Sequence, residues 1–440
     1  MSKNKVYALI DCNNFFVSCE KVFRPELQDR SAVVLSNNDG CIVARSGDIK
    51  KLKEVPMGIP YFKVEHLLAE KRAAIFSANF GLYGDFSRRV VEALKTVTPH
   101  VEVYSIDESF IEVSSLLIDD YAVWARQLHE KILKWTGIPV GIGVGESKTL
   151  AKAAAEYGKQ HDGSGQAISL IGQPKKTTDL GWTLSREEVL RWLPIQEVWG
   201  IGRRLGPQLR AYGVYTAYDL TQVPEAWAHQ QLTVRGLKTL KELKGEACWE
   251  YMHGDDQQKQ MAVTRMFGHN ICSLSELEKA VANFAARAAA RLRRHNQIAG
   301  GVHVYLRTGQ HAPQAYYPST YTTTRYPTAD TSVIIQAALE GLQRIYREGF
   351  SYRKAGVTLL NLSSQDGQQL PLIEPQTEEQ LLQRESLMQA MDRLNARYGK
   401  NALMTAAQGV GERQDWYSKR ERRSPEYTTR WSDLPVVKTS

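Results

Sequence analysis

Three acidic residues, in two short stretches of the sequence, have the types and spacing needed for metal-dependent chemistry. Asp11 ends an apolar run, and Asp107 and Glu108 are adjacent between two β-type runs. Neighbouring side chains on a regular strand point to opposite faces, so Asp107 and Glu108 can share one site only at a turn, which predicts a β-hairpin there. A single Asp after a strand is more often a turn former, so the prediction rests on the three carboxylates together.

Carboxylates held close together repel one another unless cations neutralise them. Hard oxygen ligands of this kind suit Mg²⁺, which keeps part of its water shell and accepts substrate phosphates. Two Mg²⁺ ions about 4 Å apart lower the pKa of an attacking hydroxyl and stabilise the leaving group of an in-line displacement. The carboxylates therefore predict a site for phosphoryl transfer that uses two Mg²⁺ ions.

The charge of the chain favours an anionic partner. Its 440 residues carry a formal net charge of +8, with a pI near 9.0, and clustered Lys and Arg side chains displace the counterions condensed on phosphate. The length exceeds what one hydrophobic core usually organises, so several domains are expected. Hydrophobic and charged residues make up 42% and 24% of the chain, as in an ordinary globular protein.

The cysteine pattern excludes a zinc site of the usual spacing. The five cysteines are Cys12, Cys19, Cys41, Cys248 and Cys272. They form no CxxC pair and no regular spacing with histidine, which predicts reduced thiols. The N-terminal stretch resembles neither a secretory signal nor a transit peptide, and no run approaches the roughly 18 apolar residues that cross a bilayer. A soluble cytoplasmic protein with no membrane association is expected.

Hydrophobic patterning predicts regions of different architecture. Residues 5 to about 175 interleave β-type runs with helical stretches, as in an α/β or α+β domain. The expected strands are Val6–Ile10, Ala32–Leu35, Val101–Ile106, Phe110–Val113 and Pro139–Val144, and the expected helices include Tyr83–Thr96, Ala122–Trp135 and Ser147–Tyr157. Residues from about 180 to 255 carry helical patterns broken by glycine and predict a small all-helical domain.

The pattern changes again from Val263. A β-α-β-β-α-β-like domain is expected from the order strand, helix, strand, helix and strand. After the first strand, the segments are a helix at about Leu274 to Arg294, a strand at Gly301–Leu306, a helix at Thr331–Glu348 and a strand at Lys354–Leu362. A linker at Ser363–Gly367 and a helix from about Glu378 to Tyr398 then precede a charged end.

Three motifs resemble the palm domain of the family Y, or translesion, DNA polymerases. They are Ala8–Glu20 (ALIDCNNFFVSCE), Tyr104–Phe110 (YSIDESF) and Gly141–Lys152 (GIGVGESKTLAK). A fourth, Val33–Cys41, is similar to the branch of UmuC-like catalytic subunits of bacterial DNA polymerase V. The resemblance covers nearly the whole chain. It implies an error-prone DNA polymerase that adds deoxynucleotides to a primer 3′ end opposite damaged template, in DNA repair and SOS mutagenesis.

The resemblance also implies a multidomain α+β fold with the right-hand arrangement of a polymerase. The expected parts are a palm of β-sheet and helices at residues 1–14 and 80–175, small fingers at 15–79, a helical thumb at 176–256 with a helix-hairpin-helix near 196–213, an α/β little-finger domain that binds DNA at 260–364, and a C-terminal partner-binding tail at 365–440.

At the site, the resemblance implies a role for each acidic residue. Asp11 and Asp107 would bridge both Mg²⁺ ions, and Glu108 would hold the ion at the primer end. The carbonyl of Cys12 would complete the shell of the nucleotide-side ion.

The same resemblance implies four contacts with the incoming dNTP. Phe15 and Phe16 would lie against the nucleotide, Phe16 in the place of an aromatic steric gate that is commonly Tyr. Phe keeps the bulk that blocks a 2′-hydroxyl but lacks the phenol's hydrogen bond. Lys159 matches the triphosphate-binding Lys of the family. Lys50 aligns with a phosphate-binding Arg, although Lys is a point charge rather than a bidentate fork and a solvated surface Lys is the alternative.

Contacts with primer–template DNA are implied in two places. Gly200 and Gly202 lie in a Gly-x-Gly turn that resembles a helix-hairpin-helix, where glycine lets backbone N–H groups approach a phosphate. Arg265 begins a set that would position duplex phosphates without reading sequence. Its other members are Arg287, Arg291, Arg293 and Arg294, for which a solvated helix face is the alternative.

The tail carries the partner predictions. Gln369, Leu370, Leu372 and Ile373 belong to a Pro-stiffened segment, residues 369–373, that resembles the peptide by which bacterial polymerases dock on the β sliding clamp. The end of the chain resembles the C-terminus of the UmuC-like branch, which is implicated in contacts with a processed UmuD-type dimer and a RecA filament. An active enzyme of this kind would associate with the nucleoid.

Two other interpretations remain to be weighed. A nucleotidyl cyclase uses a similar palm with two metal-binding acids, but Tyr104–Phe110 lacks its GG[DE]EF-type turn. A catalytically inactive polymerase fold that serves as a DNA-binding recruitment module would have no need of intact Asp11, Asp107 and Glu108.

Overall fold

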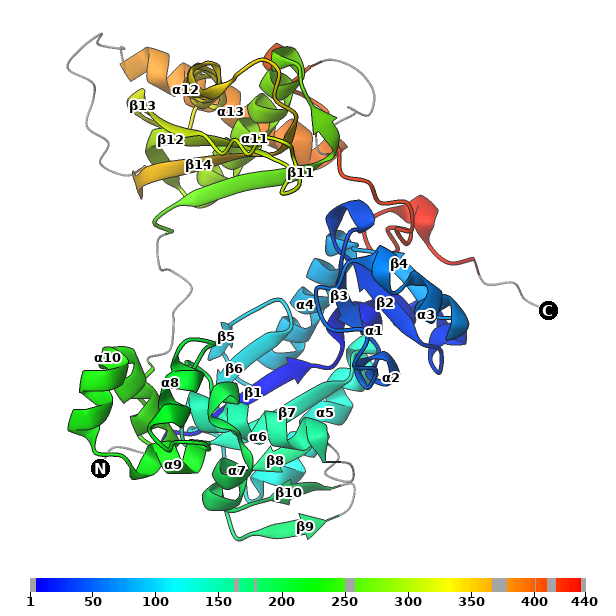
Figure 1. Cartoon of the computed structure of the whole chain (residues 1–440), viewed down its shortest axis with the longest axis vertical. Coiled ribbons are helices and arrows are strands. Elements are labelled where there is room, and N and C mark those ends of the chain that lie inside the picture. The colour runs from blue at the N-terminus through cyan, green and yellow to red at the C-terminus, as the bar shows by residue number, and fades with distance from the viewer. Residues whose placement is uncertain are drawn as a thin grey trace. The chain divides into compact units, whose positions relative to one another are not determined.

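The chain forms two compact units in a computed structural model (Figure 1). The first unit comprises Met1–Ser36, Gly40–Gly254 and Glu421–Ser440, and the second comprises Asn37–Asp39 and Asp255–Arg420. The structure describes residues 5–161, 166–177, 180–249, 258–365, 378–399, 401–409 and 417–436. In this described part, no helix is long and apolar enough to cross a membrane.

A seven-stranded sheet forms the centre of the first unit. Its strand order is β5-β6-β1-β7-β8-β10-β9. The strands are β1 (Tyr7–Cys12), β5 (Val101–Val103), β6 (Glu108–Glu112), β7 (Val140–Gly145), β8 (Ala167–Ser169), β9 (Lys175–Thr177) and β10 (Gly181–Thr183). Every residue of β1 is buried, because β1 pairs with β6 on one side and β7 on the other and helices cover both faces.

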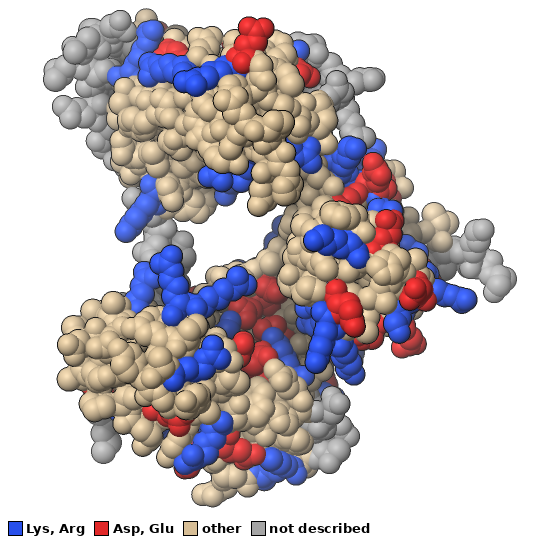
Figure 2. Space-filling view, in the orientation of Figure 1, with Lys and Arg blue, Asp and Glu red and all other residues tan. Residues whose placement is uncertain are grey.

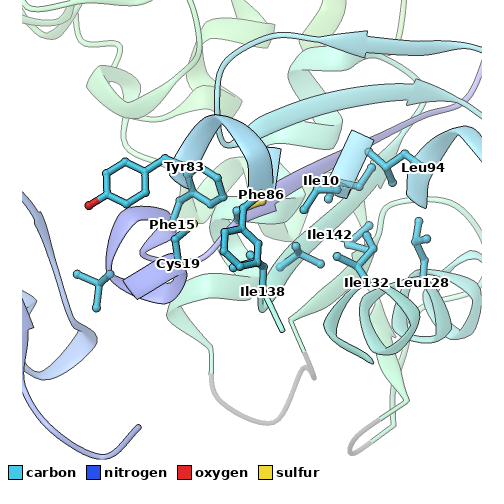
Figure 3. Packing of buried hydrophobic residues seen from close by; sticks show 14 of the residues in the cluster. Ile10, Phe15, Cys19, Tyr83, Phe86, Leu94, Leu128, Ile132, Ile138 and Ile142 are labelled. Atoms are coloured by element: carbon cyan, nitrogen blue, oxygen red, sulfur yellow. The ribbon is translucent and has the colours of Figure 1, made fainter. Parts of the chain in front are cut away.

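The alternation of side chains along β1 divides its residues between the two faces. Ala8 and Ile10 pack into a core with α4 (Phe80–Lys95) and α5 (Tyr121–Thr136), part of which Figure 3 shows. Tyr7 and Leu9 face the opposite side and pack against α6 (Lys148–Gln160). The continuous apolar run before Asp11 therefore fits a central strand that is covered on both sides.

A smaller sheet of three strands, in the order β3-β2-β4, belongs to the same unit. The elements here are α1 (Phe15–Val22), β2 (Ala32–Leu35), β3 (Ile42–Arg45), α2 (Gly47–Lys50), α3 (Glu65–Glu70) and β4 (Ala74–Ser77), with short 3₁₀ turns between them. Val33 and Leu35 pack under α3 in a separate small core, whereas α1 packs on α4 and the larger core.

Four helices follow the large sheet along the chain. They are α7 (Arg186–Trp192), α8 (Leu205–Ala211), α9 (Ala217–Gln222) and α10 (Glu225–Leu243). The buried carboxylate of Glu242 in α10 accepts hydrogen bonds from the backbone N–H of Thr149 at 3.0 Å and of Cys248 at 2.6 Å. The start of α6 is thereby tied to the end of α10.

The second unit contains the order of elements expected from Val263 onward, β-α-β-β-α-β. These are β11 (Met261–Ile271), α11 (Leu274–Arg294), β12 (Gln297–Thr308), β13 (Ser319–Thr328), α12 (Thr331–Ile345) and β14 (Tyr352–Ser364), followed by α13 (Glu378–Tyr398). The sheet order is β11-β14-β12-β13, and both α11 and α12 pack on it in one apolar core. Strand β13 alternates polar residues with few apolar ones, so the sequence pattern alone did not single it out.

Candidate active site

Asp11 and Glu108 face each other across two neighbouring strands. They are paired residues in the antiparallel register of β1 and β6. Asp11 is only 8% exposed, and burial raises its pKa from 3.8 to about 6, although the hydrogen bond and charge of Lys159 oppose the rise and the Glu108 carboxylate adds to it. Two of the three predicted acids are therefore brought together by strand pairing.

Asp107 occupies the turn that the adjacent carboxylates require. β5 ends at Val103 and β6 begins at Glu108. The hydroxyl of Ser105 closes this turn, because it accepts hydrogen bonds from the backbone N–H of Asp107 at 3.2 Å and of Glu108 at 3.0 Å. The Asp107 carbonyl accepts a hydrogen bond from the Cys12 N–H at 2.8 Å, which fixes the turn against the end of β1.

Two lysines of α6 neutralise the carboxylates. Lys159 Nζ lies 2.6 Å from Asp11 Oδ2, and Lys152 Nζ lies 2.7 Å from Glu108 Oε1. Burial alone would raise the pKa of Glu108, but the hydrogen bond and charge of Lys152 bring it below its ordinary value. Burial would lower the pKa of Lys159, and Asp11 raises it above its ordinary value. Figure 2 shows acidic and basic side chains adjoining one another over the large sheet.

Helix α6 reaches the carboxylates because two glycines of β7 let it lie directly on the sheet. A Cβ at Gly143 would stand 2.1 Å from the Ala151 carbonyl oxygen, and one at Gly145 would stand 2.8 Å from Leu150 Cβ. Ser147 starts the helix by accepting a hydrogen bond from the Leu150 N–H through its side chain. Any larger residue at these glycines would displace the helix and its two lysines.

The carboxylates lie at one end of a cleft of about 230 Å³. The residues that line it are Asp11, Cys12, Asn13, Asn14, Phe15, Phe16, Val43, Ala44, Arg45, Lys50, Met57, Asp107 and Lys159. The lining therefore contains seven of the eight residues predicted to be catalytic, metal-binding or nucleotide-binding, and Glu108 is the one that it lacks.

The carboxylate oxygens are ligands that suit a hard divalent cation. The two lysines of α6 lie beside them and balance their negative charge. Within the described ranges, no three His, Cys, Asp or Glu side chains are already gathered as a set of metal ligands. Asp11 and Glu108 are each engaged by a lysine instead. A metal ion held by these residues would compete with the two lysines for the carboxylates.

The aromatic side of the cleft is closely packed. The Phe16 ring stacks on Tyr83 with centroids 4.5 Å apart and an interplanar angle of 12°, and it meets Phe80 edge-on at 5.8 Å. Phe15 is 3% exposed and its side chain belongs to the large core. A nucleotide contact by Phe15 is therefore left to its backbone, whereas the half-buried Phe16 ring borders the cleft.

Lys50 also lines the cleft, at the end of α2. Desolvation, followed by the positive charges of Lys159 and Arg45, lowers its pKa. Three cations thus surround a region with room for a ligand, and this gathering of positive charge suits a polyphosphate.

The predicted DNA contacts lie outside this cleft. Gly200 has φ +91°, and a Cβ there would stand 2.8 Å from the Thr239 hydroxyl, so both backbone conformation and packing require glycine at this position. At Gly202, by contrast, a Cβ would meet nothing within 4 Å. In the second unit, desolvation and the charges of Arg287 and Arg291 lower the pKa of Arg265. These three arginines form a positive cluster.

Arg293 has a different environment from the other arginines of α11. Its guanidinium lies 2.7 Å from the Asp392 carboxylate of α13 and donates to the Ala329 carbonyl at 2.7 Å. Its predicted role as a phosphate contact competes with this internal ion pair. The clamp-like segment, residues 369–373, lies outside the described residues.

Comparison with known proteins identifies the family of the chain. The sequence model of the impB/mucB/samB family matches residues 10–156, and the model of that family's C-terminal domain matches residues 258–372. Protein UmuC of Salmonella typhimurium is 37% identical over 440 residues, covering 98% of this chain and all of UmuC. Protein MucB of Escherichia coli is 36% identical and covers 98% of this chain and 99% of MucB. The chain belongs to the impB/mucB/samB family.

More distant proteins share the fold of this impB/mucB/samB protein. DNA polymerase IV of Oceanobacillus iheyensis is 25% identical over 94% of each chain. A Y-family DNA polymerase chimera of Dbh and Dpo4 superposes with a TM-score of 0.63 at 20% identity, covering 82% of this chain and 99% of the chimera. The insertion ternary complex of Dbh DNA polymerase gives a TM-score of 0.53 at 18% identity, over 82% and 99%. The expected multidomain polymerase fold is confirmed.

Two functional candidates in this impB/mucB/samB protein were missed by reasoning from sequence. Lys152 was quoted within a motif but given no role, although it pairs with Glu108. Arg45 was not singled out from the sequence at all, and it lines the cleft. The spacing of Lys152 and Lys159, seven residues apart on one helix face, is the signal that could have found the first.

Proposed function

We propose that the chain is an error-prone translesion DNA polymerase, which extends a primer 3′ end opposite damaged template in DNA repair and SOS mutagenesis. Membership in the impB/mucB/samB family and the similarity to DNA polymerase IV support this function. The observation that carries it is the pairing of Asp11 with Glu108 beside Asp107, at the end of a cleft with cations and an aromatic wall. A DNA-binding recruitment module would gain nothing from that arrangement.

Polymerases of this family generally depend on divalent metal ions. Asp11, Asp107, Glu108 and the Cys12 carbonyl are the oxygen ligands that would hold two Mg²⁺ ions. When bound, such ions lower the pKa of the primer 3′-hydroxyl and stabilise the charge of the leaving pyrophosphate. The carboxylates must be ionised for this, so the raised pKa of Asp11, about 6, sets the acid limit of the site.

The lysines of α6 give the cleft a second state. Lys159 pairs with Asp11, and its long side chain would be able to turn to a bound triphosphate instead. Lys50 would bind the same triphosphate from the opposite wall. Lys152 keeps Glu108 ionised until it is needed as a ligand.

The aromatic side of the cleft would select the sugar. Phe16 borders the cleft and is supported from behind by Tyr83. A ring fixed in this position would exclude a 2′-hydroxyl and so favour dNTP over rNTP by its bulk rather than by hydrogen bonding.

Further partners follow from the family resemblance. Gly202, with Gly200 shaping the turn, and the cluster around Arg265 would contact phosphates of primer–template DNA. Gln369, Leu370, Leu372 and Ile373 would dock on a β sliding clamp. A processed UmuD-type dimer and a RecA filament complete the assembly that we propose, in the bacterial cytoplasm and at the nucleoid when active.

The test is Mg²⁺-dependent primer extension on a template with an abasic site. The processed UmuD-type dimer and activated RecA are supplied, and the intact chain is compared with the double variant Asp107→Ala/Glu108→Ala. Extension by the intact chain and none by the double variant is the expected result.

Two other results would contradict the proposal. Equal products from both proteins would point to a contaminating polymerase. No extension by either protein, although both bind the primer–template, would favour the recruitment module.

A further inference from the structure

The residues near the C-terminus pack against the wall of the cleft. Residues 385–437 match the model of a domain of unknown function. Its last part, which we call the docking segment (Arg422–Tyr427), lies beside the edge strand β4 in Figure 1. The Ser77 N–H donates to the Arg422 carbonyl at 3.0 Å, and the Arg422 N–H donates to the Ser77 hydroxyl at 2.9 Å. The segment thus pairs with the end of β4.

The docking segment also contacts Asn79, the N-cap residue of α4. Asn79 is fully buried and caps this helix by accepting a hydrogen bond from the Leu82 N–H. Its Nδ2 donates to the Ser424 hydroxyl at 3.0 Å and to the Pro425 carbonyl at 3.3 Å. One side chain therefore fixes both the start of α4 and the docking segment, so the two are held together.

The end of the docking segment enters the large core. Tyr427 is 8% exposed and stacks on Phe23 with centroids 4.6 Å apart, and Phe23 in turn contacts Phe86 of α4. Phe23 lies directly after α1, which carries Phe16. Tyr427 consequently packs on the residue that follows α1, and through Phe23 it is connected to the middle of α4.

A buried carboxylate connects these contacts with the sugar-facing wall. Glu20 of α1 is fully buried and accepts a hydrogen bond from the Tyr83 hydroxyl at 2.6 Å. Burial raises the pKa of Glu20, while the Tyr83 hydroxyl and then the Ser424 hydroxyl oppose the rise. The docking segment therefore lies against the same buried group that orients Tyr83, and the Tyr83 ring supports Phe16 at 4.5 Å.

We propose that the docking segment is a positioning element of the nucleotide pocket, which sets sugar selection by fixing α1 and α4 and, through Tyr83, the ring of Phe16. This inference rests on the proposed function, because it takes Phe16 to face the sugar of an incoming nucleotide. It assigns an intramolecular role to residues 422–427. Tyr427 and Ser424 are positioning residues and touch no substrate.

The experiment measures kcat/KM for a dNTP and for the matching rNTP in primer extension, with the partner proteins supplied. The ratio of the two values is the readout, because a general loss of folded protein lowers both values and leaves the ratio unchanged. Tyr427→Ala is expected to lower the ratio about 10-fold, since small misplacements of a positioning group have effects of this order. Tyr427→Phe keeps the stacked ring and is expected to retain the ratio of the intact chain.

Three further variants complete the test. Ser424→Ala removes one acceptor of Asn79 and leaves the core intact, so it serves if Tyr427→Ala does not fold, with a reduction of a few-fold expected. Trp431→Ala is the matched control, because Trp431 is 90% exposed and lies beyond the docking segment. In Phe16→Ala, the added Tyr427→Ala change should no longer alter the ratio, because residues that act through one another are not additive.

Each of the other outcomes shows whether the positioning role, the assignment of Phe16 or the proposed function is wrong. If Phe16→Ala lowers the ratio while Tyr427→Ala and Ser424→Ala do not, the docking segment has no positioning role and the proposed function stands. If Phe16→Ala leaves the ratio unchanged, Phe16 does not face the sugar and the inference falls with that assignment. If the intact chain synthesises no DNA, the proposed function itself is wrong.

Discussion

The two ends of the cleft are stabilised in opposite ways. At the carboxylate end, buried charges are held by ion pairs between the sheet and α6, and a bound metal ion would compete with these lysines for the carboxylates. At the aromatic end, Phe16, Phe80 and Tyr83 are already packed together and need no rearrangement. Under the proposed function, reactivity would depend on an exchange of charges, whereas selectivity would depend on a wall that stays fixed. The following changes would test that distinction.

The largest effect is expected at Asp11. Asp11→Asn keeps the shape of the side chain but removes the charge that would bind metal, so single-turnover primer extension should slow by on the order of 10³-fold. Asp119→Asn, at an exposed residue outside the cleft, is the matched control and should leave the rate unchanged. A slowing of less than tenfold would show that Asp11 is no metal ligand.

A smaller effect, on stability, is expected at the aromatic end. Tyr83→Phe preserves the stack on Phe16 but removes the 2.6 Å hydrogen bond that its hydroxyl donates to the buried Glu20, which should lower the free energy of unfolding by about 1–3 kcal/mol. Urea unfolding measures the change. Tyr212→Phe, at a 54% exposed ring, should change it by less than about 0.5 kcal/mol. Equal stability of the two variants would mean that the Glu20–Tyr83 hydrogen bond does not stabilise the wall.

The carboxylate end should also respond to pH. The pKa of Asp11 is raised to about 6, so below this pH a proton competes with the metal ion for the carboxylate. The half-saturating Mg²⁺ concentration should rise about tenfold for each pH unit below 6 and level off above pH 7, as expected for one competing proton. Metal titrations of primer extension from pH 5 to 8 measure this. A flat profile down to pH 5 would contradict the raised pKa.

The smallest effect concerns Lys152. Lys152→Gln removes the group that lowers the pKa of Glu108, so Glu108 becomes protonated at a higher pH. Asp11 still sets the position of the acid limb of the pH–rate profile, so the limb should become steeper below pH 6 as a second carboxylate is protonated there; the change should be small, because the pair is partly solvated. Lys134→Gln, at an exposed position of α5, should leave the slope of the limb unchanged. An unchanged slope in Lys152→Gln would show that Lys152 does not act on Glu108 in this way.

Reasoning from sequence performed unequally at the two ends of the cleft. The carboxylates could be found because Asp11 ends a hydrophobic strand and Asp107–Glu108 interrupt another, which are local patterns. The order of elements from Val263 could be predicted for the same reason, apart from the polar strand β13. The domain bounds and the residue roles remain predictions.

The contacts that support the aromatic end of the cleft could not be predicted from local sequence patterns. Phe16, Tyr83 and Tyr427 come from three distant parts of the chain, and each is an ordinary aromatic residue in its own stretch. Only the packing of α1 on α4 brings them together. The ion pair of Lys152 was missed for a related reason, since a basic residue on a helix usually faces solvent.

The contact between Asn79 and Ser424 has a consequence for folding. It joins residues separated by 345 positions, and an entire second core forms within the loop that it closes. Contacts of such separation form slowly, because the intervening chain must be ordered before the ends can meet. Refolding is therefore expected to produce the sheet and its carboxylates first, and the packing of the docking segment on α1 and α4 last.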